Sequence, residues 1–246
     1  MIILTKLILA HIIGDFILQP SSWVKDKNEK KLYSSRIYIH ILVHAILMFV
    51  LLWDIKMWPM ITILVITHFL IDIAKIYFQS DSSEYRKPFL SPTTWFFLDQ
   101  ALHIIAIFTA VYFFVDTGWD FNAIFNNNFW LLLTFILFIT FASSIIIRVT
   151  MHKWTEELTK NSNDDSLNKA GTYIGILERL FIFVFVLSGN WASIGLLLTA
   201  KSVFRFGDLR ESDDRRLTEY MLIGTLISFG IAIFSAMLYE KIRMAG

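Results

Sequence analysis

Histidine and aspartate recur at a spacing of four residues in segments that are otherwise almost entirely apolar. Residues four apart lie on one face of an α-helix, one turn from each other. The chain has no cysteine, so any metal ion must be held by nitrogen and oxygen donors, which these residue types supply. The spacing therefore favours a divalent metal site. The residues concerned are His11 and Asp15, His40 and His44, His68 and Asp72, and Asp99 and His103.

Long apolar blocks must position these side chains. The chain of 246 residues is 56% hydrophobic and 17% charged, with a mean hydropathy of +0.58, whereas soluble domains are about 25% charged. A membrane-spanning helix needs about 20 mostly apolar residues, and we predict an all-α, polytopic integral membrane bundle of about eight transmembrane helices. The spans are expected at 2–19, 37–53, 58–79, 94–115, 129–149, 172–188, 191–204 and 218–239.

The basic residues indicate how this bundle is oriented. Lysine and arginine concentrate in segments 20–36, 80–93, 150–171 and 205–217, which the positive-inside rule places in the cytoplasm, with both termini outside. At a rise of 1.5 Å per residue, the four polar pairs then lie about 6 to 15 Å inside the cytoplasmic surface. Polar and ionised groups at that depth are costly when they face lipid. We therefore expect them to converge in a pocket that opens to the cytoplasm.

The polar segment 116–128 is the best candidate for a domain boundary. It predicts a four-helix membrane domain with the His/Asp cluster at 1–118, and a second helical membrane domain with charged cytoplasmic loops at 119–246. The net charge of +1 and the absence of a basic tract argue against nucleic acid as a partner.

The sequence suggests a role for each polar residue. Asp15, Lys75 and Asp99 are candidates for acid–base and charge-stabilising catalysis. The candidate metal ligands are His11, His40, His44, His68, Asp72 and His103. Candidates for substrate contact or for support of the ligands are Gln19, Arg36, Gln100, Glu178, Arg179, Arg205 and Glu219. Zinc, manganese and iron all suit these donors.

Four motifs carry a resemblance to a known family. "AHIIGDFILQ", "HILVH", "THFLIDIAK" and "FLDQALH" resemble the bacterial membrane proteins grouped as domain of unknown function 3307, over residues 5–115. The histidine motifs are also distantly similar to integral membrane proteins described as putative metal-dependent hydrolases. The resemblance implies a multi-pass protein of the bacterial inner membrane, and by analogy a hydrolase.

Three functions remain open at this point. The leading one is metal-dependent hydrolysis of a membrane or amphipathic substrate of (phospho)ester type, with the lipid bilayer as surroundings. The second is a metal- or proton-coupled transporter, or a membrane sensor, that uses the same cluster without chemistry. The third is a structural role, in which each histidine bonds to a neighbouring helix. The nearly featureless outer halves of the first four helices favour a pocket over a channel.

Overall fold

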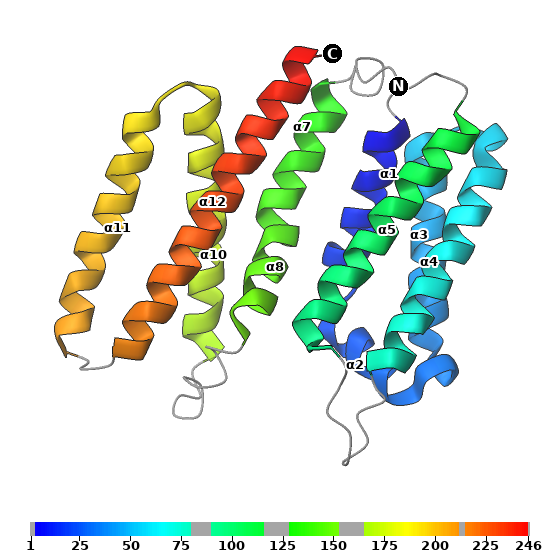
Figure 1. The fold of residues 1–246 in the computed structure, drawn as a ribbon, viewed down its shortest axis with the longest axis horizontal. Helices are drawn as coiled ribbons and strands as arrows, with labels where there is room; N and C mark the ends of the chain where they lie inside the picture. Colours follow the sequence, from blue (N-terminus) through cyan, green and yellow to red (C-terminus); the bar gives the residue numbers. More distant parts are fainter. Residues whose placement is uncertain (1–2, 80–89, 116–127, 153–164, 212–214, 246) are drawn as a thin grey trace. The chain divides into compact units, whose positions relative to one another are not determined.

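A computed structural model describes residues 3–79, 90–115, 128–152, 165–211 and 215–245, and all regular structure in these ranges is helical (Figure 1). The helices form two compact units, Met1–Thr134 with Ala245–Gly246 (unit 1) and Phe135–Met244 (unit 2). The division therefore lies within α7 (Asn128–Leu137), and the predicted boundary at 118/119 falls outside the described residues. In chain order the elements are α1 (Ile3–Ile12), the π-helix η1 (Ile13–Ile17), α2 (Ser21–Lys30), η2 (Lys31–Tyr33), α3 (Ser35–Leu52), η3 (Ile55–Met57), α4 (Trp58–Gln79), α5 (Pro92–Phe114), α7 (Asn128–Leu137), the π-helix η4 (Phe138–Ala142), α8 (Ser143–Thr150), α10 (Asp165–Leu187), α11 (Trp191–Glu211) and α12 (Arg215–Ala245).

Every predicted span contains a helix, but the predicted number of spanning helices is not confirmed. Within the described residues, five helices are long and apolar enough to cross a membrane, and a sixth is added if the bent pair Ile3–Ile17 and Ser21–Tyr33 is one span. The apolar part of α11, Trp191–Val203, is too short to count. A further helix, α10, carries the charged pair Glu178 and Arg179 in its middle.

The helices of unit 1 bury polar side chains and expose apolar ones. On α4, the buried side includes His68 and Asp72, while Ile66 and Leu70 on the opposite side are exposed. This distribution is the reverse of a soluble helix, and it matches a bundle whose outer surface contacts lipid. The apolar helices of unit 1 therefore suit a lipid bilayer environment.

An apolar cluster fills one end of the unit 1 bundle. Its members precede His11 in α1 and His68 in α4, and follow His44 in α3 and His103 in α5, so they lie on one side of the polar residues. The prediction that one half of each of these helices is almost entirely apolar is thus confirmed. The cluster consists of Leu4, Leu7, Ala10, Met48, Met60, Ile61, Leu64, Ile107, Ala110 and Val111.

The segment 20–36, predicted to be a loop, instead forms α2 and η2. Pro20 is extended, with ψ of 153°, and the chain turns by 83° between Ile3–Ile17 and Ser21–Tyr33. A residue before proline disfavours the α conformation, which explains the break after Gln19. Figure 1 shows α2 across the lower end of the unit 1 helices.

Asp26 fixes α2 to the start of α3. Its carboxylate accepts hydrogen bonds from Lys30 and from the Ser34 hydroxyl, the latter at 2.5 Å. The Lys30 ammonium, assisted by Ser34, holds the pKa of Asp26 below its ordinary value. Ser34 also caps α3 by accepting from the backbone N–H of Arg36. One short network therefore sets the angle between the two helices.

Candidate metal centre

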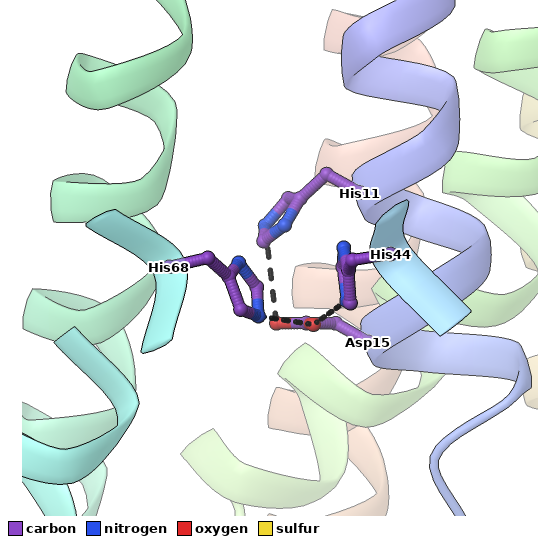
Figure 2. Close-up of side chains that lie close together, drawn as sticks. All are labelled: His11, Asp15, His44 and His68. Atoms are coloured by element: carbon purple, nitrogen blue, oxygen red, sulfur yellow. Dashed lines mark hydrogen bonds and ion pairs between the residues drawn. The ribbon is translucent and has the colours of Figure 1, made fainter. Parts of the chain in front are cut away.

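Polar side chains from α1, η1, α3, α4 and α5 meet inside unit 1, as predicted. His11 lies at the end of α1 and Asp15 in η1, while His44 and His68 extend from α3 and α4. Figure 2 shows the three imidazole rings around the Asp15 carboxylate. All three histidines are buried.

The Asp15 carboxylate is the common contact of this group. Its Oδ1 lies 2.9 Å from His44 Nε2 and 3.7 Å from His68 Nε2, and its Oδ2 lies 3.9 Å from His11 Nε2. His40 Nε2 also approaches Oδ1, at 3.4 Å. A regular α-helical stripe was predicted for His11, Asp15 and Gln19, but Asp15 lies in a π-helix. Such widened turns are frequent at functional sites.

A second group surrounds Asp72. Lys27 Nζ donates to Asp72 Oδ2 at 2.8 Å, and His40 Nε2 lies 3.6 Å from the same oxygen. His40 Nε2 is also 3.2 Å from His68 Nε2 and 3.3 Å from Gln19 Nε2. Asp72 is thus already paired with a cation of the chain.

A third group surrounds Asp99 on α5. Lys75 Nζ donates to Asp99 Oδ2 at 2.7 Å, and His103 Nδ1 lies 2.9 Å from the Asp99 carbonyl oxygen. Gln100 Nε2 donates to Asp15 Oδ2 at 3.1 Å and to Asp99 Oδ2 at 3.2 Å. The remaining Gln100 oxygen accepts from His11 Nε2 at 3.1 Å. Gln100 therefore joins the first group to the third.

The donor atoms fit a metal ion. His11, Asp15, His44 and His68 each offer one ligand atom, and all of these atoms lie within 4.8 Å of one another. Zn–N bonds of 2.0–2.1 Å separate tetrahedral ligand atoms by roughly 3.3 Å, so pairwise separations would have to shrink by at most about 1.5 Å to close the set. Four buried imidazole nitrogens also lack a hydrogen-bond partner among the described residues, namely Nδ1 of His11, His40 and His44 and Nε2 of His103.

The charges indicate where a cation is needed. Of the three carboxylates in these groups, Asp72 pairs with Lys27 and Asp99 with Lys75. Among the described residues, the polar contacts of Asp15 come from imidazoles and the Gln100 amide. An isolated carboxylate in a dry bundle is costly. The Asp15 group is therefore the position at which an added cation would be stabilised most.

The comparison with protein families gives one match. The family described as "Protein of unknown function (DUF3307)" matches residues 3–132, more than half of the chain. The chain belongs to the DUF3307 family. No curated protein and no solved structure gives a significant match. The DUF3307 match covers all three groups of the candidate metal centre.

Four of the predicted site residues lie beyond the part of the chain that matches the DUF3307 family, namely Glu178, Arg179, Arg205 and Glu219. Glu178 is buried in unit 2 and pairs with Lys201 at 2.5 Å. Arg179 is buried beside it. Glu219 is exposed, and the side chain of Arg205 lies outside the described residues. Their predicted role near a substrate stays a prediction.

Within the DUF3307 match, Arg36 is not brought to the cluster. It is exposed and its guanidinium lies 5.6 Å from the Trp23 ring centroid. The formation of α2 explains this difference, because it inserts an ordered helix beside the residue that was expected to contact substrate or to support the ligands.

Two residues at the centre were not predicted from the sequence. Lys27 was counted with the cytoplasmic charges, yet it is buried against Asp72, 45 positions away. Gly14 packs under His44: a Cβ added there would lie 2.3 Å from His44 Nε2. Neighbouring residues in the sequence predict neither contact. The Lys27 contact depends on the bend after η1, and the Gly14 contact depends on the approach of α3.

We expect Gly14→Ala to disturb the centre, because its methyl group would collide with a fully buried ring. Overpacking of this kind costs about 1–3 kcal/mol, so the free energy of unfolding in detergent should fall by that amount. Gly224→Ala is the control, since a Cβ at Gly224 meets nothing within 4 Å. A Gly14→Ala protein as stable as Gly224→Ala would contradict the close packing.

Proposed function

We propose that unit 1 binds a divalent metal ion between His11, Asp15, His44 and His68, and that this centre serves a metal-dependent hydrolase. The observation that carries the proposal is the approach of imidazoles from three helix segments to a buried carboxylate with no lysine or arginine partner described. Zinc, manganese and iron suit this nitrogen and oxygen set.

The surrounding residues support hydrolytic chemistry. A divalent ion at Asp15 would supply a Lewis acid and an acidified water. Lys75 is only partly buried and could reach an anionic oxygen by leaving Asp99. These groups suit an amphipathic phosphoester, presented from the bilayer.

The proposed orientation follows from the basic residues and from α2. Together, α2 and η2 carry four of the lysines that the positive-inside rule assigns to the cytoplasm, and α2 lies at the end of the unit 1 helices that Figure 1 shows below. We therefore infer that the centre faces the cytoplasm of a bacterial inner membrane, beneath α2. Labelling an engineered cysteine at Lys25, in intact and in permeabilised cells, tests this assignment.

The transporter alternative has less support. A through-path needs polar groups along both halves of the bundle, whereas the end opposite α2 is filled by the apolar cluster. A sensor without chemistry remains an outcome of the experiment below.

Metal analysis of the purified protein tests the first half of the proposal. After exposure to Zn²⁺ or Mn²⁺ and removal of excess ion, we expect at least one ion per chain by plasma mass spectrometry. His44→Gln should lose it, while His152→Gln, an exposed histidine elsewhere, should not. Absence of bound metal in the unmodified chain, or equal amounts of bound metal in the two variants, would reject the proposed metal centre.

Hydrolysis is tested separately. Bis-p-nitrophenyl phosphate and a fluorescent phospholipid, each with and without chelator, should show turnover that chelation removes and added metal restores. Metal binding without turnover would reject the hydrolase, and ion flux into proteoliposomes would then favour the transporter.

A further inference from the structure

Two buried side-chain atoms on α5 that could ligate a cation have no hydrogen-bond partner among the residues that the structure describes: Asp99 Oδ1 and His103 Nε2. Both residues are almost completely buried. Buried polar atoms are rarely left unpaired, and each exception needs an explanation. Together with Asp15, these two residues form a group in which each side chain offers a ligand atom within 4.8 Å of the others.

The hydrogen bonds of His103 fix its tautomer. Its Nδ1 lies 2.9 Å from the Asp99 carbonyl oxygen, which can only accept, so Nδ1 carries the proton. The lone pair is therefore on Nε2, which lies 3.9 Å from Asp72 Oδ1 and has no hydrogen-bond partner among the described residues. A histidine that donates one ring N–H to a carbonyl and keeps the other nitrogen open has the arrangement of metal-ligating histidines.

Gln100 holds two carboxylates side by side. Its amide nitrogen donates to Asp15 Oδ2 and to Asp99 Oδ2, at 3.1 and 3.2 Å. The other Asp15 oxygen, Oδ1, faces His44 and His68. Asp15 Oδ1 thus serves His44 and His68, while Oδ2 lies between His11 and the side chain of Gln100 that links it to Asp99.

We propose that the centre is dinuclear, with Asp15 bridging a first cation held by His11, His44 and His68 and a second held by Asp99 and His103. This inference rests on the proposed function and extends it. Two-metal hydrolytic sites have ions about 3.5–4 Å apart, a separation that one carboxylate can bridge. Two divalent cations with Lys27 and Lys75 outweigh three carboxylates, so the loaded centre would attract an anionic substrate such as a phosphate ester.

The group of His40, His68 and Asp72 is a poorer second position. It shares His68 with the first group, and one imidazole nitrogen cannot ligate both ions. One oxygen of Asp72 is also occupied by the Lys27 ammonium at 2.8 Å. Asp99 has a lysine partner as well, but its Oδ1 is buried and accepts no hydrogen bond from the described residues.

Metal stoichiometry and electron paramagnetic resonance test the inference. The Mn²⁺-loaded full chain should bind two ions and give a spin-coupled signal. His103→Gln and Asp99→Asn should each bind one ion and give an uncoupled signal, which also shows that the first position is intact. The double variant Lys27→Met/Asp72→Asn should keep two coupled ions.

The outcomes separate this inference from the proposed function. One ion in the unmodified chain, lost in His44→Gln but kept in His103→Gln, overturns the dinuclear centre and leaves the single-metal proposal standing. Two ions in both His103→Gln and Asp99→Asn, or loss of one in Lys27→Met/Asp72→Asn, overturns the assignment to Asp99 and His103. No ion in any protein rejects both proposals.

Discussion

Lys27→Met is expected to lower the free energy of unfolding by about 3–5 kcal/mol, the usual effect of removing one partner from a buried ion pair. Lys27 is 5% exposed and Asp72 6%, and their charged atoms lie 2.8 Å apart. Methionine fills a similar volume but leaves the Asp72 carboxylate without its counter-ion. The remaining charge is then buried among histidines that can only partly compensate it.

A double variant and a matched lysine make this result specific. Lys27→Met/Asp72→Asn removes both charges and should recover most of the lost stability, since the cost comes from the unpaired charge. Lys25→Met changes a lysine on the same helix whose side chain is 79% exposed, and it should cost less than about 1 kcal/mol. Unfolding can be followed by denaturant titration in detergent micelles. Equal losses in Lys27→Met and Lys25→Met would show that the ion pair does not form.

This ion pair also explains why α2 is ordered. The helix is polar and short, and an isolated helix of ten residues is unstable in water. Lys27 holds it to α4, and Asp26 holds it to Ser34 at the start of α3. Lys27, one of the basic residues from which the orientation was predicted, therefore also holds α2 to the candidate metal centre.

The sequence predicted the helices and the convergence of the cluster because both depend on local patterns. Apolar block length places α3, α4 and α5 within two residues of their observed bounds. The cost of polar groups in lipid then leaves the bundle interior as the one favourable place for His44, His68 and their neighbours. The cost of polar groups in lipid and the four-residue spacing therefore both predict that the cluster converges.

The remaining features depend on contacts between distant residues. The bend at Pro20 and the widened turn of η1 decide that Lys27 reaches Asp72 and that Arg36 does not reach the cluster. Gln100 was predicted to contact substrate or to support the ligands, but its partners were not, and the structure shows it linking Asp15, Asp99 and His11. No periodicity specifies a pairing across 85 residues.

Arg179→Met is expected to destabilise unit 2 by about 3 kcal/mol, because hydrogen bonds from a charged donor contribute about 1.5–3 kcal/mol each and desolvation offsets part of their sum. Arg179 Nε donates to the Ile139 carbonyl oxygen at 2.6 Å, and Nη2 donates to the Ser144 hydroxyl at 2.5 Å. Its Nη1 donates to Ser228 on α12 at 3.1 Å. One side chain thus joins η4, α8 and α12 to α10.

The π-helix makes this guanidinium specifically important. A widened turn displaces backbone carbonyls from regular partners, and in a membrane bundle other groups must satisfy them. Arg179 reaches the carbonyl oxygens of both Ile139 and Thr140. Arg179→Lys keeps the charge but loses the planar fork, so it should recover less than half of the lost stability.

Arg243→Met is the control for this variant, since Arg243 is exposed and contacts only the face of Tyr239, at 5.9 Å, among the interactions described for it. Its removal should cost less than about 1 kcal/mol. Full stability in Arg179→Lys would show that charge alone is needed, and the fork-shaped bonding to η4 would be wrong. Equal losses in Arg179→Met and Arg243→Met would remove the role of Arg179 altogether, leaving the η4 carbonyls to be satisfied by Ser143 and Ser144, which already donate to them.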